Sequence, residues 1–206
     1  MTTRTLAVVS AGLSNPSSTR LLADRLTTAT VAALTDRGIT ATVEVVELRE
    51  HARDLADDLL TGFANKPLQA AVDTVVRADA VIAVTPIFSA SYSGLFKTFF
   101  DVLDKDALVG TPVLMGATAG TARHSLALEH ALRPLFAYLR ATVVPTAVFA
   151  AAEDWAGSGE AGRGLADRVA RAAGELADLV AGRPPAAPVD LFADPATSFE
   201  DLLRGS

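Results

Sequence analysis

Apolar runs alternate along the chain with segments in which apolar residues recur every three or four positions. This alternation is typical of strand–helix–strand units built around a parallel sheet. The third run, Ala80–Thr85 (AVIAVT), is the most continuously apolar, which predicts a central strand covered by helices on both faces. We expect five strands, at Thr5–Ser10, Ala41–Leu48, Ala80–Thr85, Thr111–Ala117 and Thr142–Ala150.

The segments between these runs predict helices. From Ser18 to Arg37 the apolar positions form one stripe that stops before Gly38, a common helix-ending residue. The charged segment His51–Leu60 predicts a connector with some helix. Further helices are expected at Leu68–Arg77, Gly94–Leu103, Arg123–Arg140 and around Leu165–Leu179.

The helix expected at Arg123–Arg140 contains a proline. The ring of Pro134 would clash with the carbonyl group of His130, four residues earlier, and Pro134 has no N–H to donate. The helix must therefore deform, and we predict a kink or a π-bulge at His130.

Length and composition fit one globular domain, because half of the 206 residues are hydrophobic and a fifth are charged. We expect this domain to span residues 1–182. The remaining tail, residues 183–206, is predicted to be extended because it is rich in proline. Its prolines are Pro184, Pro185, Pro188 and Pro195.

Charge and residue content exclude several function classes. A net charge of −6 gives no sign of the basic surface that nucleic acid or an anionic membrane selects. The absence of cysteine excludes disulfides, thiolate catalysis and zinc–thiolate sites. No leader and no apolar run of the roughly 18 residues that span a bilayer is found, so we expect a cytoplasmic protein. The acidic clusters Asp54–Asp58 and Glu153–Asp154 are expected to be solvated surface, and we predict no metal site.

The order of elements predicts where a ligand would bind. Five strands with right-handed crossovers favour a three-layer α/β sandwich of strand order 2-1-3-4-5, whose ligands lie beyond the carboxyl ends of strands one and three. Three loops follow the central strands: Ser10–Arg20, Pro86–Ser93 and Thr118–Thr121. We expect the functional residues in these loops.

The first loop, SAGLSNPSSTR, places several hydroxyl side chains at the start of a predicted helix. Free backbone N–H groups and the helix dipole favour an anion there, and a phosphate monoester suits the short hydroxyl donors. With Gly12 as its only glycine, the loop is neither a Walker A nor a GxGxxG motif. The alternative is that Ser17 or Ser18 caps the helix and the other hydroxyls are turn residues.

The second loop begins the segment TPIFSASYSGLFKTFFD, residues 85–101. Its apolar Ile87–Phe88 step, small hydroxyls and glycine at a helix start suit a flat ring. The alternative is that Phe88 and Tyr92 pack into the core. The band of Phe96, Phe99, Phe100 and Leu103 on the following helix fits either a homodimer interface or core packing.

Together, SAGLSNPSSTR, TPIFSASYSGLFKTFFD and the segment GATAGTARHSLALEHALRPLFAYLRA after the fourth strand closely resemble the NAD(P)H-dependent FMN reductases of flavodoxin-like fold. The resemblance spans roughly Leu6–Phe149. It implies FMN, with NADPH or NADH as hydride donor, no catalytic side chain, and a homodimer or homotetramer. The chain is most similar to reductases that supply reduced flavin to monooxygenases of the luciferase-like or alkanesulfonate type.

The resemblance also implies cofactor-binding residues in each loop. The FMN phosphate is expected at Ser10, Ser17, Ser18, Thr19 and Arg20. The isoalloxazine ring and ribityl chain are expected at Pro86, Ile87, Phe88, Ser91, Tyr92 and Ser93. Backbone N–H groups of Thr118, Ala119, Gly120 and Thr121 are expected at the pyrimidine end. Relatives often have two adjacent glycines where this chain has Ala119 and Gly120, and a positive φ at Ala119 would be costly.

Two other functions share this fold and cofactor. A flavodoxin-like electron carrier would bind FMN without nicotinamide turnover. A quinone or azo-dye reductase would share the hydride step but keep FMN tightly bound. His124, at the expected start of the helix after the third loop, is predicted either near the ligand or facing solvent.

Overall fold

The computed structural model describes residues 2–155 and 160–183. Beyond Arg183, the tail predicted over residues 183–206 lies outside the described residues. Among those that are described, no helix has the length and apolar composition that crossing a membrane requires.

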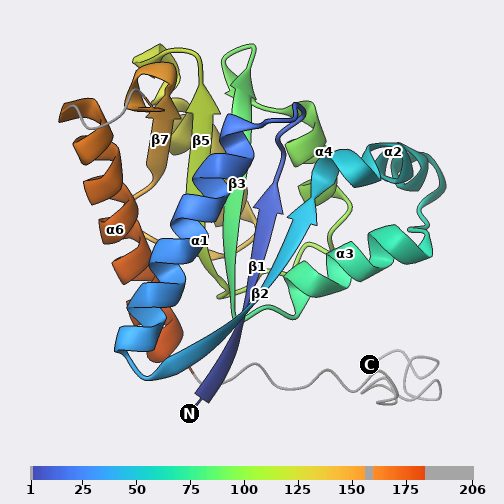
Figure 1. Ribbon diagram of the computed structural model, residues 1–206. Coiled ribbons are helices and arrows are strands. Elements are labelled where there is room, and N and C mark those ends of the chain that lie inside the picture. Colours follow the sequence, from blue (N-terminus) through green and yellow to red (C-terminus); the bar gives the residue numbers. More distant parts are fainter. Residues whose placement is uncertain (1, 156–159, 184–206) are drawn as a thin grey trace.

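A parallel sheet forms the centre of the molecule (Figure 1). Its strand order is β2-β1-β3-β5-β6, with β7 also paired to β5. The strands are β1 (Thr2–Ser10), β2 (Ile39–Glu47), β3 (Ala80–Phe88), β5 (Pro112–Ala119), β6 (Thr142–Val143) and β7 (Val148–Ala151). This confirms the flavodoxin-like class and the predicted order.

The number of strands differs from the expected five. The fifth strand, expected at Thr142–Ala150, is split into β6 and β7, and both pair with β5. Pro145 lies between them and has no N–H to donate to a neighbouring strand. The other additional strand, β4 (Ser91–Tyr92), pairs with β3 in an antiparallel hairpin where a loop was expected.

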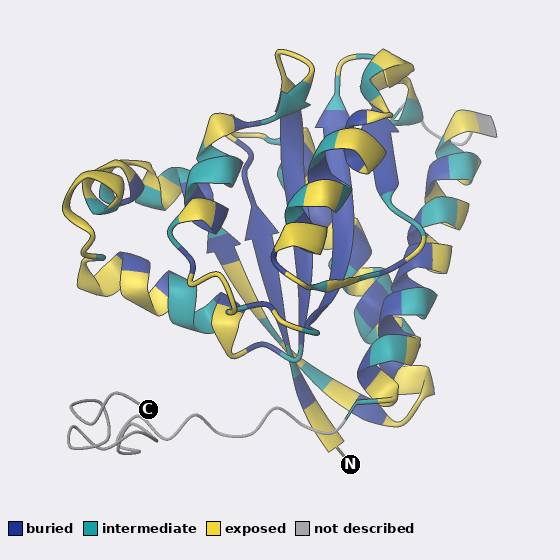
Figure 2. Cartoon of the chain, turned by 180° about the vertical axis from the view of Figure 1, so that it is seen from behind, coloured by how far each residue is buried: buried dark blue, intermediate teal, exposed yellow. Residues whose placement is uncertain are grey.

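Helices cover both faces of the sheet, which gives the three predicted layers (Figures 1 and 2). On one face lie α1 (Ser18–Asp36) and α6 (Glu160–Ala181). The other face carries α2 (Ala52–Thr61), α3 (Lys66–Val76), α4 (Gly94–Asp101) and α5 (Arg133–Tyr138). Alternate residues of β1 enter the two cores: Leu6 and Val8 pack on the α1 side, Ala7 and Val9 on the other.

The aromatic band of α4 is core within a single chain. Phe96, Phe99 and Phe100 are buried, and the Phe96 and Phe100 rings also contact Phe136 of α5 at centroid distances of 6.3 and 5.0 Å. Core packing therefore accounts for this band without a second copy of the chain.

The predicted helix at Arg123–Arg140 is interrupted. A short 3-10 turn (Ala122–His124) comes first, then a π-helical turn (Leu128–Leu132), and only then α5. The π-turn contains His130, as predicted, and the N–H of Arg133 donates to the carbonyl of Leu128. The one-residue shift in hydrogen bonding accommodates Pro134, which cannot donate to the His130 carbonyl.

Candidate cofactor site

The carboxyl ends of β1, β3 and β5 meet at one edge of the sheet and border a pocket of about 350 Å³. Residues of all three predicted loops line this pocket. They are Leu13, Ser14, Ser17, Ser18, Thr19, Pro86, Ile87, Phe88, Thr118, Ala119 and Gly120. The sequence therefore predicted most of the lining, but not Leu13 and Ser14. These two lie in the middle of the first loop, where Leu13 is an apolar residue among hydroxyls.

The first loop is folded closely against the start of α1. Ser17 is the N-cap, and its side chain accepts a hydrogen bond from the N–H of Arg20 at 3.3 Å. A Cβ at Gly12 would lie 2.1 Å from the Ser17 Oγ and 3.2 Å from the Thr19 Cβ. A side chain at position 12 would therefore displace the Ser17 hydroxyl from its capping position. Capping by Ser17, one of the two predicted alternatives, is confirmed, while Ser17 also lines the pocket.

A hydrogen bond between two threonines joins the first loop to the end of β5. The Oγ1 atoms of Thr19 and Thr118 lie 2.8 Å apart, and both residues are buried. Because 99 positions separate these residues in the sequence, this contact fixes the start of α1 relative to the third loop.

Ser10 lies beneath the pocket rather than in its wall. It shares the α1 face of β1 with Leu6 and Val8, since alternate strand residues point the same way. It is fully buried, and its hydroxyl has no hydrogen-bond partner among the described residues. A buried hydroxyl without a partner is costly, so an acceptor at this position would be stabilising.

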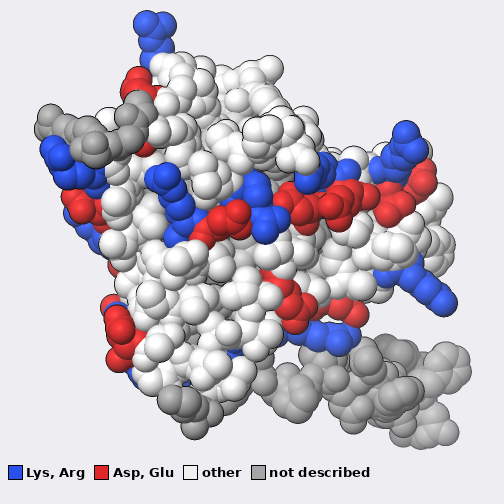
Figure 3. Space-filling model, viewed as in Figure 1, with Lys and Arg blue, Asp and Glu red and all other residues white. Residues whose placement is uncertain are grey.

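Among the described residues, none that lines the pocket has an ionisable side chain. Arg20, the nearest cation of the first loop, lies beside the pocket and pairs with Asp24 (Nε–Oδ1, 2.7 Å) and Glu47 (Nη1–Oε1, 2.5 Å). The hydrogen bond to Glu47, which has the larger effect, and the hydrogen bond to Asp24 both raise the pKa of Arg20. Figure 3 shows mixed charges across the α1 side of the molecule and mostly uncharged surface above them. The lining itself offers an anion neutral donors, namely hydroxyls and the first N–H groups of α1, while outside it the Arg49 guanidinium donates to the Ser14 carbonyl at 3.2 Å.

These observations fit the phosphate end of FMN. Gly12 lets the first loop pack closely against the helix start, the donors are short hydroxyls, and the buried Ser10 hydroxyl lacks a partner among the described residues. At the other end of the pocket lie apolar Ile87 and Phe88, which suit a flat ring.

The β3–β4 hairpin forms one rim of the pocket. Its two-residue turn places Ser89 and Ala90 at φ values of 48° and 68°, the left-handed region that favours glycine or asparagine. The turn presents Phe88, whose surface is 48% exposed.

Three residues predicted beside the ring stand outside the pocket lining. Ser93 caps α4 by accepting from the N–H of Phe96 (3.2 Å), and its own N–H donates to Thr85 Oγ1 (3.1 Å). Ser91 pairs with Phe88 in the hairpin, and the Tyr92 ring packs 5.9 Å from Phe96.

The third loop holds its predicted place without strain. Ala119 ends β5 and pairs with Ala151 in an extended conformation, so alanine is accommodated where relatives often have glycine. Thr121 accepts a hydrogen bond from the N–H of Arg123 at 3.4 Å and does not line the pocket. His124 also stands outside the lining, and its side chain is partly exposed.

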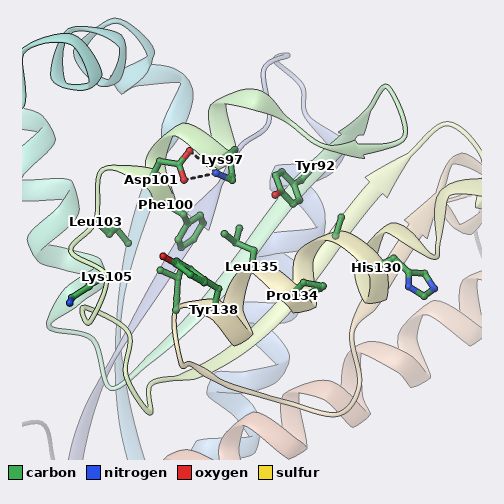
Figure 4. A pocket seen from close by; sticks show the side chains of 12 residues that line it. Tyr92, Lys97, Phe100, Asp101, Leu103, Lys105, His130, Pro134, Leu135 and Tyr138 are labelled. Atoms are coloured by element: carbon green, nitrogen blue, oxygen red, sulfur yellow. Dashed lines mark hydrogen bonds and ion pairs between the residues drawn. The ribbon is translucent and has the colours of Figure 1, made fainter.

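A second, larger groove of about 690 Å³ lies between α4 and the π-turn with α5 (Figure 4). Aromatic and charged side chains line it, including Tyr92, Lys97, Asp101, His130 and Tyr138. Lys97 and Asp101 form an exposed ion pair at 2.5 Å, and the hydrogen bond to Asp101 raises the pKa of Lys97. Tyr138 is 77% exposed.

Comparison with known proteins identifies the family. Residues 4–156 match the model of the family described as NADPH-dependent FMN reductase. The chain belongs to this family. The resemblance stated from the three loops is thereby confirmed, as are the expected enzyme class and cofactors.

Individual relatives agree with the family assignment. An FMN reductase (NADPH) of Pseudomonas aeruginosa is 37% identical over 86% of this chain and 93% of its own length. An NADH-dependent FMN reductase, SfnE, of Pseudomonas putida is 38% identical over 82% of this chain and 88% of its own. The crystal structure of an oxidoreductase from Corynebacterium diphtheriae superposes with a TM-score of 0.86 at 49% identity, covering 89% of this chain and all of that one.

Proposed function

We propose that this FMN reductase binds FMN in the 350 Å³ pocket and carries out hydride transfer from NADPH or NADH there. The observation that carries the proposal is the meeting of hydroxyls, a helix start and an apolar rim in one uncharged pocket. When bound, FMN supplies the ring that accepts the hydride.

The residues of this chain position the cofactor. Ser17, Ser18 and Thr19 would hold the phosphate together with the first N–H groups of α1, because each offers a short neutral donor. Pro86, Ile87 and Phe88 would lie along the ring, and the backbone of Thr118–Gly120 would donate to the pyrimidine end as negative charge grows there. No side chain is required as nucleophile or general base, because the cofactors carry the reacting atoms.

The absence of charge in the pocket lining favours FMN as an exchangeable substrate rather than a permanently bound group. Hydrogen bonds from charged donors to phosphate are roughly twice as strong as neutral ones, and the guanidinium of Arg20 is already paired with two carboxylates. The rim of the pocket also exposes two large apolar side chains, Leu13 and Phe88. We propose that the enzyme releases reduced flavin to a partner monooxygenase in the cytoplasm, and the uncharged lining and exposed apolar rim support such release.

The test is steady-state oxidation of each nicotinamide by purified protein with free FMN in excess, followed by gel filtration of FMN-loaded protein. We expect continued turnover and loss of FMN on the column. Turnover of a quinone by protein that retains its FMN would instead establish the quinone-reductase alternative. FMN binding without nicotinamide oxidation would establish an electron carrier.

We propose further that a second copy of this chain covers the α4–α5 groove, forming a homodimer or homotetramer. Exposed tyrosines beside buried aromatic residues are typical of protein interfaces. Tyr138 and Tyr92 both line this groove, next to buried Phe100. Because Pro134 causes the π-turn in its wall, we expect Pro134→Ala to alter oligomer size or FMN affinity. Sedimentation and FMN titration check this, and no change in either would contradict it.

A further inference from the structure

Thr19 differs from the other threonines of α1 in the partner of its hydroxyl. Four others donate back to the carbonyl four residues earlier: Thr27, Thr28, Thr30 and Thr35. Thr19 is the second residue of α1, so the residue four positions earlier lies outside the helix. Its hydroxyl instead meets Thr118 of β5, and within the described part of the chain each of these two hydroxyls has the other as its partner.

A pair of hydroxyls leaves one hydrogen unused. Each threonine carries one O–H hydrogen, and only one of the two can lie between the oxygens. The other must point to a third atom that accepts it. Thr19 and Thr118 are 2% and 3% exposed, so bulk water is not available to most of their surface, yet both line the cofactor pocket.

The position of the pair favours an anionic acceptor. Thr19 lies in the first turn of α1, beside the N–H groups that favour negative charge, and the unpartnered hydroxyl of Ser10 points to the same face of the sheet. A phosphate oxygen with full negative charge can only accept, and Thr19, at the start of α1, is the hydroxyl placed to donate to it, which leaves Thr118 to donate to Thr19.

We propose that Thr118 is a positioning residue for the FMN phosphate: its hydroxyl donates to Thr19, and the Thr19 hydroxyl donates to the phosphate. This proposal rests on the proposed function of the pocket. Two hydrogen bonds in series polarise one another, so each strengthens the other. The phosphate would thereby also be coupled to the Thr118–Gly120 segment, which lines the same pocket.

The experiment compares FMN with riboflavin, which lacks the phosphate, in fluorescence titrations of Thr19→Val, Thr118→Val and the double variant. Valine keeps the shape of threonine and removes the hydroxyl. We expect the Kd of FMN to rise about tenfold or more in Thr19→Val and about fivefold in Thr118→Val, as for charged and neutral hydrogen bonds. The double variant should be no weaker than Thr19→Val, because Thr118 acts through Thr19. Riboflavin affinity should change by less than about twofold in all three.

Two controls separate this role from general loss of structure. Thr118→Ser keeps the hydroxyl and should restore FMN affinity. Thr30→Val removes a buried hydroxyl of the same helix outside the pocket, where Thr30 Oγ1 donates to the Leu26 carbonyl at 2.8 Å. It should lower the thermal midpoint without changing the ratio of FMN to riboflavin affinity.

An equal loss of FMN and riboflavin affinity in Thr118→Val would overturn the proposal, as would full additivity of the two substitutions. Failure of the unaltered protein to bind FMN would instead refute the proposed function of the pocket. The two failures are therefore distinguishable.

Discussion

The α4–α5 groove and the cofactor pocket, two of the cavities in the described part of the chain, differ in size and in the side chains that line them. The α4–α5 groove is the larger, at about 690 Å³, and contains ionisable and aromatic side chains. The cofactor pocket is about half that volume and has no ionisable lining residue. Of the two, only the pocket lies where the carboxyl ends of the central strands meet. Only the pocket borders a helix start against which a glycine, Gly12, is closely packed. Position in the sheet and donor type, rather than volume or charge, therefore support the proposal that FMN binds in the pocket.

The largest effect should follow substitution of Gly12. In Gly12→Ala the new Cβ would overlap the Ser17 Oγ, displacing the cap and the turn that we propose binds the phosphate. We expect FMN affinity to fall about a hundredfold, which corresponds to about 2.7 kcal/mol, within the range of overpacking and lost-cap costs. Titration with FMN measures this.

Gly94→Ala is the matched control, because a Cβ at Gly94 meets no atom within 4 Å. It should leave FMN affinity within about twofold of the unaltered protein. Undiminished FMN binding by Gly12→Ala would show that the first loop does not form part of the FMN site.

A substitution in the α4–α5 groove should change the oligomeric state and leave FMN affinity nearly unchanged. Tyr138→Glu places a charge on an exposed groove residue, and burying that charge between two copies would cost several kcal/mol. We expect the oligomer to dissociate, as measured by sedimentation, while FMN affinity of the subunit stays within about threefold. Loss of FMN binding with an intact oligomer would indicate that the groove, and not the pocket, binds FMN.

Relief of strain in the hairpin should stabilise the protein. Ser89→Asn with Ala90→Gly supplies the residues that a turn with two positive φ values favours. We expect about 1–2 kcal/mol of added stability, or a rise of about 2–6 °C in Tm. Thermal unfolding measures this, and an unchanged or lower Tm would show that the turn carries no such cost.

The smallest effect concerns the ion pair beside the π-turn. Arg133 donates to both carboxylate oxygens of Glu129, at 2.5 and 2.9 Å, and this hydrogen bonding lowers the pKa of Glu129. A lowered pKa means that the pair stabilises the fold above the ordinary carboxyl pKa and loses this contribution as the pH falls. Since both side chains are partly exposed, we expect Glu129→Gln to cost at most about 1 kcal/mol at pH 7.

Unfolding of both proteins across the acid range checks the sign of this effect. The difference between Glu129→Gln and the unaltered protein should shrink as the pH falls through the carboxyl range. A difference that grows on acidification would contradict the account.

The sequence predicted the features that depend on local chemistry. Apolar runs located the central strands, and the clash between Pro134 and the His130 carbonyl located the π-turn. Features that depend on tertiary contacts were not predicted. The turn of the hairpin at Ile87–Tyr92 consists of Ser89 and Ala90, and neither is the glycine or asparagine by which such turns are predicted from sequence.

The pairing of Arg20 illustrates the same limit within the site. Its hydroxyl-rich surroundings favoured a phosphate contact, but its partner Glu47 lies 27 positions away at the end of β2. Similarly, Leu13 and Ser14 line the pocket because Gly12 folds the loop over α1. Spacing along the chain does not reveal such contacts.

Anaerobic titration of the protein with FMN, followed by NADPH and then NADH while the flavin absorbance is recorded, tests the central claim most directly. If hydride transfer occurs in this pocket, FMN binds saturably and is bleached rapidly by at least one nicotinamide, and bleaching continues as free FMN is added in excess. FMN that binds but is bleached by neither nicotinamide would contradict hydride transfer in this pocket.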